Sequence, residues 1–84
     1  MNGVAMNRFI LYGTIGCHLC DEAEALLLPL LSPESSIEYV DISESDALVE
    51  QYGVLIPVLH RLRDDMELRW PFDSLQAQLF LSAI

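Results

Sequence analysis

Residues 9–20 read Phe-Ile-Leu-Tyr-Gly-Thr-Ile-Gly-Cys-His-Leu-Cys, and this stretch decides the fold. Phe9 to Tyr12 form a short apolar run with aromatics, which predicts a buried strand. From Leu19 onward, apolar residues recur at three- and four-residue steps and predict a helix with one apolar stripe. The stripe consists of Leu19, Ala23, Leu26, Leu27 and Leu30. Cys17 and Cys20 therefore lie where a buried strand passes into a helix.

The next part of the chain predicts a second strand and a short helix. Pro29 lacks an N–H group, so it should kink or end the first helix. Residues 36–42 contain β-favouring side chains and predict the strand. Ser43 or Ser45 can cap a short helix that runs to Tyr52. Gly53 follows, and its left-handed freedom is typical of a helix end.

The C-terminal part predicts a hairpin and a last helix. Residues 57–62 and 66–70 are apolar-rich and flank the polar turn Arg63-Asp64-Asp65. After Pro71, Asp73 or Ser74 can cap a helix. We expect three side chains of this helix to face the core: Leu75, Leu79 and Phe80.

The predicted order is β-α-β-α-β-β-α. A helix joins the first two strands, so they should be parallel through a right-handed crossover. The hairpin adds two antiparallel strands. The expected fold class is therefore α/β, with a four-stranded mixed sheet flanked by helices, which is the minimal thioredoxin fold. With 84 residues, the chain is expected to form one domain over 1–84.

The net charge of the sequence excludes some classes of binding partner. The sequence has 13 acidic residues, 4 arginines and no lysine, for a formal net charge of −9. Nucleic acids and anionic membranes bind through basic contacts, so we expect neither as a partner. The first residues show no basic cluster before an apolar run, and Ala25 to Leu31 is too short an apolar stretch to span a bilayer. We expect a cytoplasmic protein.

The Cys17-His18-Leu19-Cys20 motif indicates a redox pair or metal ligands. A dithiol site needs an exposed thiol that attacks as the thiolate and a second thiol that resolves the mixed disulfide. At a helix start, unpaired backbone N–H groups and the helix dipole favour a thiolate on Cys17. Cys20 lies one turn deeper on the same face. We therefore expect Cys17 to be the nucleophile, Cys20 the resolving cysteine, and the two to close a disulfide on oxidation.

Alternatives to a dithiol site remain open. A structural zinc ion needs four ligands, but His18 is wedged between the cysteines and His60 has no partner at zinc-finger spacing. We expect no metal site within one chain, although a metal ion or iron–sulfur cluster shared across a dimer stays an alternative. His18 is either a modulating imidazolium beside Cys17 or an exposed intervening side chain.

A second motif is Gly53-Val54-Leu55-Ile56-Pro57-Val58. Pro57 cannot donate a hydrogen bond to a sheet. If the Ile56–Pro57 bond is cis, the backbone of Ile56 is left open to pair with an extended thiol substrate. The alternative is an ordinary trans proline at the start of an edge strand.

Together these motifs resemble glutaredoxins, and especially a short, divergent, mostly bacterial glutaredoxin-like group. The resemblance rests on Cys-x-Leu-Cys-Asp at residues 17–21, Tyr-Gly-Val-x-Ile-Pro-Val at 52–58, and Trp-Pro-Phe-Asp at 70–73. It covers nearly the whole chain from Arg8. It implies Cys17 as the attacking thiol, Cys20 as the resolving thiol, a cis Pro57 and a glutathione-facing edge at Ile56.

The resemblance also implies lesser site residues and has clear departures. Tyr12 matches a family position, although a core aromatic would fit there equally. Asp73 keeps the helix-start position that in glutaredoxins helps to hold the glutamyl end of glutathione. Gly13-Thr14 replaces the usual lysine, and Pro71-Phe72 replaces a Gly-Gly turn. Only Arg69 could substitute for the missing cation, and a solvated strand charge is its simpler interpretation.

These observations predict a glutaredoxin-like thiol–disulfide oxidoreductase that reduces protein disulfides or glutathione mixed disulfides and serves cell redox homeostasis. We expect no tightly bound cofactor, with glutathione as a potential co-substrate. The expected partner is a disulfide-containing protein or glutathione, and the expected state is a monomer. The alternatives are a redox-sensing or partner-binding module with little turnover, and a carrier of a dimer-bridged iron–sulfur cluster.

Overall fold

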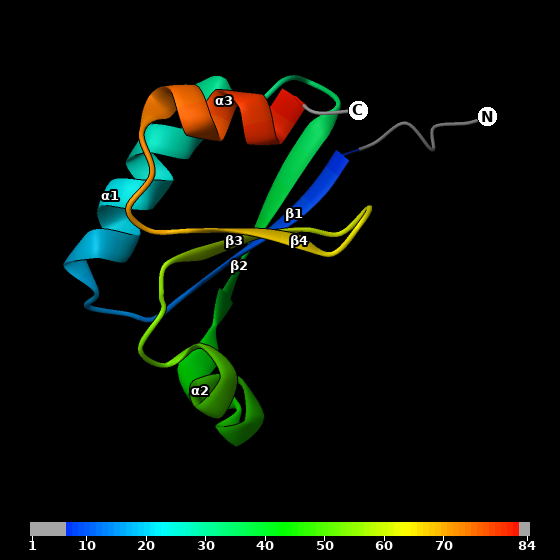
Figure 1. The fold of residues 1–84 in the computed structure, drawn as a ribbon. Helices are drawn as coiled ribbons and strands as arrows, with labels where there is room; N and C mark the ends of the chain where they lie inside the picture. Colours follow the sequence, from blue (N-terminus) through cyan, green and yellow to red (C-terminus); the bar gives the residue numbers. More distant parts are fainter. Residues whose placement is uncertain (1–6, 83–84) are drawn as a thin grey trace.

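The computed structural model describes residues 7–82. These residues form four strands and three α-helices in the predicted order (Figure 1). The elements are β1 (Asn7–Gly13), α1 (His18–Leu27), β2 (Ser35–Asp41), α2 (Asp46–Tyr52), β3 (Val58–Arg61), β4 (Met66–Arg69) and α3 (Ser74–Ser82). Two 3-10 turns, η1 (Leu28–Leu30) and η2 (Ile42–Glu44), follow α1 and β2.

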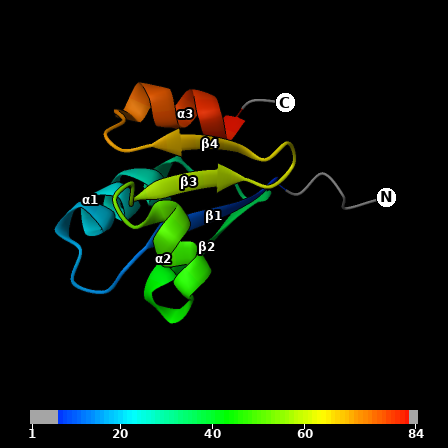
Figure 2. The same ribbon diagram turned by 60° about the horizontal axis from the view of Figure 1, so that its bottom comes forward.

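The four strands form one mixed sheet in the order β2-β1-β3-β4 (Figure 2). β1 pairs in parallel with β2, and its other edge pairs antiparallel with β3. β3 and β4 form the expected antiparallel hairpin. Tyr12 is opposite Val58, so the turn after β1 and the turn before β3 lie at the same end of the sheet. That end carries the Cys17 motif and Pro57.

Alternation along β1 gives the sheet two buried faces. Phe9 and Leu11 belong to a core cluster with side chains of α1 and α3, which lie on one side of the sheet (Figure 1). Tyr12 belongs to a second cluster with Tyr52 and Val58, on the side covered by α2. The central strand is therefore held from both sides at the end that leads into the cysteines.

The predicted apolar stripe of α1 is partly wrong. Leu19 is exposed, whereas Cys20, Ala23 and Leu27 are fully buried. The helix begins at His18 with Cys17 as its N-cap, and this start turns the Cys20 side of the helix toward the sheet. Pro29 lies in η1, so the α-helix ends just before it, as expected.

The predicted core face of α3 is also wrong in two of its three residues. Leu75 and Leu79 are each 63% exposed, while Ala77 and Leu81 are buried. Phe80 is half-buried and packs against the core cluster, as expected. Both pairs are spaced four residues apart, so helical spacing alone cannot choose between them. The choice depends on how α3 lies against α1 and the sheet.

Gly53 ends α2 for a different reason from the predicted one. Its φ of −52° is right-handed, so no left-handed freedom is used. A Cβ at this position would lie 2.5 Å from the carbonyl oxygen of Val49. Glycine is needed there for space. Ser45 is the N-cap of α2, because its hydroxyl accepts a hydrogen bond from the N–H of Leu48.

None of the helices formed by residues 7–82 is long and apolar enough to cross a membrane.

Candidate active site

Cys17 is the N-cap of α1. Its sulfur accepts a hydrogen bond from the backbone N–H of Cys20 at 3.2 Å, and its carbonyl accepts one from the N–H of Asp21 at 3.1 Å. Cys17 and Cys20 are joined in a disulfide with Cα atoms 5.2 Å apart. In the reduced protein, the same N–H group and the N-terminal end of the helix dipole would stabilise a thiolate on Cys17.

The two cysteines differ in exposure. Cys17 is half-buried, whereas Cys20 is 0% exposed. Of the two cysteines, only Cys17 is therefore in contact with solvent. Cys20 lies behind it, on the side of α1 that faces the core. This difference in exposure favours the predicted division into an attacking and a resolving thiol, which stays a prediction.

The turn that delivers Cys17 needs a glycine. Gly16 has a φ of +84°, a left-handed conformation that is costly for residues with a side chain. The turn is closed by a hydrogen bond from the N–H of Cys17 to the carbonyl of Thr14 at 3.3 Å. The sequence pattern predicted no role for Gly16, although the Gly-Cys pair before the helix was an available signal.

His18 lies along the outer face of α1. Its Nε2 atom is 2.7 Å from a carboxylate oxygen of Glu22, and its side chain is exposed. Glu22 therefore competes with any interaction between the imidazole and the Cys17 sulfur. This geometry favours the interpretation of His18 as an exposed intervening residue, and a modulating role stays a prediction.

The Ile56–Pro57 peptide bond is cis, as the resemblance implied. The backbone at Ile56 is less open than expected, because its N–H donates to the carbonyl of Tyr52 at 3.1 Å. A substrate strand that pairs with this N–H must displace that bond. Trp70–Pro71 is a second cis bond, which the sequence did not predict, and the Trp70 N–H donates to the Pro57 carbonyl at 3.2 Å.

The other predicted site residues have structural partners. Tyr12 is buried, with its ring 4.3 Å from that of Tyr52 and its hydroxyl 3.3 Å from Nδ1 of His60. This position favours a core aromatic over a substrate contact. Asp73 caps α3, since its carboxylate accepts from the Gln76 N–H at 2.8 Å. Its predicted contact with glutathione stays a prediction.

Arg69 is at the active-site end of β4, where it is opposite Val58. Its Nη2 atom is 3.9 Å from a carboxylate oxygen of Glu67, and the guanidinium is largely exposed. Glu67 also accepts a hydrogen bond from the Tyr52 hydroxyl at 2.6 Å. Arg69 could therefore meet an anionic group near Pro57 only in competition with Glu67.

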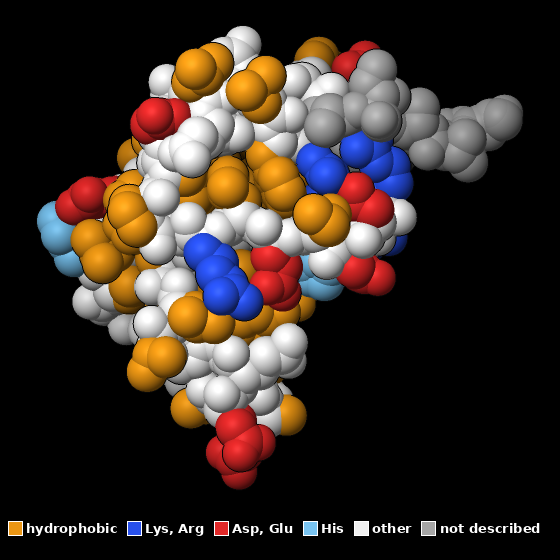
Figure 3. All heavy atoms as spheres, viewed as in Figure 1, with side chains coloured by type: hydrophobic (Ala, Val, Ile, Leu, Met, Phe, Trp, Pro, Cys, Tyr) orange, Lys and Arg blue, Asp and Glu red, His pale blue; other side chains and the backbone are white. Residues whose placement is uncertain are grey.

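Exposed apolar side chains flank the Cys17 motif and the Pro57 turn. Ile15 is 87% exposed, Val54 is 99% exposed, and Leu19 is also exposed. We call these three residues the apolar rim. Figure 3 shows hydrophobic side chains gathered on the face formed by α1 and the β3–β4 hairpin. Single exposed apolar residues are normal, but these three belong to the two segments that carry the cysteines and Pro57, which makes them candidates for a contact surface.

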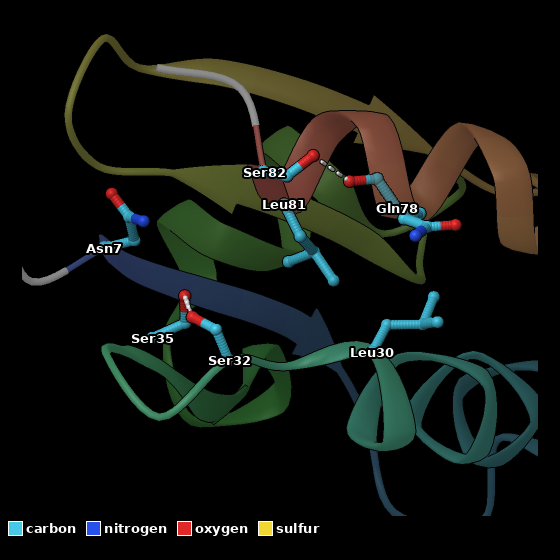
Figure 4. Close-up of a pocket in the computed structure, with 7 residues that line it drawn as sticks. All are labelled: Asn7, Leu30, Ser32, Ser35, Gln78, Leu81 and Ser82. Carbon is cyan, nitrogen blue, oxygen red and sulfur yellow. Dashed lines mark hydrogen bonds between the residues drawn. The ribbon is translucent and has the colours of Figure 1, made fainter.

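Two further observations limit the chemistry. Among residues 7–82, no group of three or more His, Cys, Asp or Glu side chains could hold a metal ion. A hollow of about 350 Å³ lies at the other end of the sheet, where β1 and β2 begin (Figure 4). It is lined by Asn7, Leu30, Ser32, Ser35, Gln78, Leu81 and Ser82, and none of these side chains is acidic, basic or a thiol. Both cysteines of the sequence lie at the opposite end of the sheet from this hollow.

The chain is similar in sequence and structure to two proteins of known structure. The chain is 34% identical to protein XcR50 from X. campestris, whose X-ray structure matches with a TM-score of 0.79 over 90% of this chain and 97% of that one. The solution structure of XcR50 gives a TM-score of 0.77. Protein Ne2328 from Nitrosomonas europaea is 33% identical, with a TM-score of 0.77 over 98% of this chain and 99% of that one. No curated protein matches the chain.

These likenesses confirm the predicted thioredoxin-like fold. The model of the glutaredoxin-like domain family (DUF836) matches residues 8–81, which includes both cysteines, Pro57 and the last helix. The chain therefore belongs to the family of glutaredoxin-like domains.

Proposed function

We propose that this protein is a thiol–disulfide oxidoreductase that reduces disulfides through Cys17 and Cys20. One observation carries the proposal. A half-buried Cys17 sulfur caps α1 and accepts the Cys20 N–H, while Cys20 is fully buried behind it and bonded to it as a disulfide. Exposure and a helix N-terminus are the features that make one thiol of a pair the nucleophile.

The reaction has two exchange steps. The Cys17 thiolate attacks one sulfur of the substrate disulfide, which breaks the substrate S–S bond, releases one thiolate and leaves a mixed disulfide on Cys17. Cys20 then loses its proton to solvent and attacks the Cys17 sulfur. The internal disulfide forms and the second substrate thiolate leaves. Two electrons pass from the dithiol to the substrate, so an external thiol must reduce the disulfide before the next cycle.

The surroundings of Cys17 favour a protein or peptide disulfide over glutathione. The apolar rim offers contact area to apolar side chains of a partner. Asp21, Glu22 and the net charge of −9 favour cationic side chains and repel the anionic tripeptide. We infer that segments with apolar and basic residues next to the reactive cysteine are the better substrates.

A turnover assay tests this proposal. Two peptides carry the same disulfide, one flanked by leucine and arginine and the other by serine and glutamate. We expect kcat/KM to be about tenfold higher for the first peptide at low salt and to converge as salt screens the charges. Equal values for both peptides at all salt concentrations would contradict the substrate class. A lack of exchange with either peptide would contradict the oxidoreductase itself.

Variants of the apolar rim test whether it contacts the substrate. Val54→Gln removes an exposed apolar side chain beside Pro57, and we expect kcat/KM for the apolar peptide to fall about three- to tenfold. Met66→Gln is the matched control, because Met66 is also an exposed apolar residue but begins β4 at the far end of the hairpin. It should leave kcat/KM unchanged. Equal losses in both variants would exclude a specific rim contact.

The same assay separates the main alternative, a redox-sensing or partner-binding module. Such a module would complete one exchange and then stop, with the Cys17–Cys20 disulfide resistant to reducing thiols. Cycling in the presence of an external thiol is the result that supports an enzyme.

A further inference from the structure

Tyr39 on β2 contacts the turn that carries Cys17. Its hydroxyl donates to the carbonyl of Thr14 at 3.2 Å. The same carbonyl accepts the backbone N–H of Cys17 at 3.3 Å. One oxygen atom therefore links the phenol of Tyr39 to the backbone of the nucleophile.

Gly13 shows how close Tyr39 comes to the second cysteine. A Cβ on Gly13 would lie 2.5 Å from the Tyr39 hydroxyl oxygen and 2.9 Å from the Cys20 sulfur. Both atoms thus occupy the space directly beside the Gly13 Cα. A side chain at this position would displace the phenol or the sulfur, so glycine allows both to lie there.

The register of the sheet explains why Tyr39 lies close to Cys20. Tyr39 is paired with Leu11 across the parallel β1–β2 ladder, and Leu11 faces α1. Tyr39 therefore projects to the α1 side, where it lines a small hollow of about 40 Å³ with Leu11, Glu24 and Leu27. Its hydroxyl lies beside Gly13, the last residue of β1. The sulfur of Cys20, on α1, lies at the same place.

We propose that Tyr39 is a positioning residue for the dithiol, holding the Thr14–Cys17 turn on β2 and lying against the Cys20 sulfur when the disulfide is reduced. The inference rests on the proposed oxidoreductase function. In the oxidised protein the S–S bond itself holds the turn. In the reduced protein that constraint is gone, and the Tyr39–Thr14 hydrogen bond then adds to the backbone bonds of Cys17 with Thr14 and Asp21 in holding Cys17 close to the Cys20 N–H. The hydroxyl therefore matters more to the reduced form.

The surroundings of Tyr39 keep its hydroxyl protonated. Partial burial, followed by the carboxylates of Asp21, Asp41 and Glu24, raises the pKa of Tyr39. Asp21 and Glu24 approach from α1, and Asp41 ends β2. The phenol can thus donate to Thr14 across the pH range in which a cysteine thiol titrates.

The phenol also lies near the buried thiol. The Tyr39 hydroxyl oxygen and the Cys20 sulfur both lie beside the Gly13 Cα. Cys20 is fully buried, whereas the Tyr39 side chain is partly exposed, so Tyr39 stands on the solvent side of this thiol.

The variant Tyr39→Phe tests the inference, because it keeps the ring and removes one oxygen. We expect the reduced form to be destabilised relative to the disulfide, so that the dithiol–disulfide equilibrium against a glutathione buffer shifts about two- to tenfold toward the disulfide. A tenfold shift corresponds to about 30 mV. Alkylation of Cys17 at neutral pH should slow by a similar factor, with its pH profile displaced to higher pH.

Tyr52→Phe is the matched control. It also removes one phenol hydroxyl, which is bonded to Glu67 on the α2 side of the sheet. Both variants are first compared with the wild type by thermal unfolding. The inference is supported if only Tyr39→Phe changes the equilibrium and the alkylation profile. It is overturned if Tyr39→Phe lowers only the melting temperature, or if the two variants shift the redox equilibrium equally.

The result is distinguishable from failure of the proposed function. If the wild-type protein exchanges disulfides and Tyr39→Phe behaves like the wild type, the positioning role is wrong and the oxidoreductase stands. If the wild-type protein shows no exchange at all, the proposed function itself is wrong.

Discussion

Cys17 and Cys20 are separated by only two residues, yet their surroundings differ. Cys17 is half-buried and accepts the Cys20 N–H at the first turn of α1, whereas Cys20 is shielded by the core. The difference comes from the strand–helix junction, as the position of the motif in the sequence predicts. The strand ends at Gly13 and the helix begins at His18. This junction leaves the first cysteine partly exposed and places the second in the protein interior.

This asymmetry predicts which thiol reacts first. When the fully reduced wild-type protein is treated with a limiting alkylating reagent at pH 7, we expect at least about tenfold more label on Cys17 than on Cys20. Peptide mapping by mass spectrometry measures the ratio. Preferential labelling of Cys20 would reverse the assignment of the two roles.

At the scale of elements, α3 shows where periodicity is insufficient. Leu75 and Leu79, which we expected in the core, are exposed, and Ala77 and Leu81 are buried in their place. Both pairs fit a helix, and only the packing of α3 against α1 and the sheet distinguishes them. In contrast, the hairpin, the Asp73 cap and the helix end before Pro29 could be predicted, because their signals are local.

The two faces of α3 predict different costs for the same substitution. Leu81→Ala removes a buried side chain and should lower the free energy of unfolding by about 2–4 kcal/mol. Leu79→Ala, on the same helix, should lower it by less than about 0.5 kcal/mol, because Leu79 is largely exposed. Urea unfolding followed by circular dichroism compares the two. A loss in Leu79→Ala as large as that in Leu81→Ala, or larger, would contradict this packing of α3.

The β3–β4 turn predicts a pH dependence of stability. Arg61 donates to both carboxylate oxygens of Asp64, at 2.9 Å and 2.8 Å, and these hydrogen bonds lower the pKa of Asp64 to about 2 from 3.8. A carboxyl group with a lowered folded-state pKa stabilises the fold above its unfolded pKa, and this contribution is lost as the pH falls through the folded pKa. We expect the wild type to melt at a higher temperature than Asp64→Asn at pH 6. That difference should shrink between about pH 4 and pH 2, and a constant difference would contradict the account.

At the scale of the whole molecule, the net charge of −9 is unfavourable for the binding of an anionic ligand such as glutathione. Thirteen acids and four arginines give a field that repels anions, and the glutaredoxin lysine is replaced by Gly13-Thr14. The sequence therefore predicts the likeness to glutaredoxins, and it also predicts the weaker attraction for anions that sets this protein apart from them. It did not predict that the Ile56 N–H is bonded to Tyr52, because that bond depends on how α2 runs into the Pro57 turn. It also assigned no role to Tyr39, whose place beside Cys20 depends on strand register.

This charge predicts weak glutathione binding. One lost charge-assisted hydrogen bond costs about 1.5–3 kcal/mol, which is about tenfold or more in affinity. We expect a chemical-shift titration of Cys17→Ser with glutathione to give a dissociation constant in the millimolar range. Arg69→Gln should weaken binding further, most clearly at low salt, if Arg69 replaces the missing lysine. Micromolar binding would show that the missing lysine and the altered Pro71-Phe72 turn do not matter.

Trapping of the mixed disulfide tests the central claim most directly. Cys20→Ser removes the resolving thiol, so attack by Cys17 on a peptide disulfide should stop at the mixed disulfide. Intact-mass analysis should show one adduct per chain, and peptide mapping should place it on Cys17. Cys17→Ser should form an adduct at least about tenfold more slowly, because the remaining thiol is buried. Equal adduct formation in the two variants, or none in Cys20→Ser, would contradict an exchange reaction that begins at Cys17.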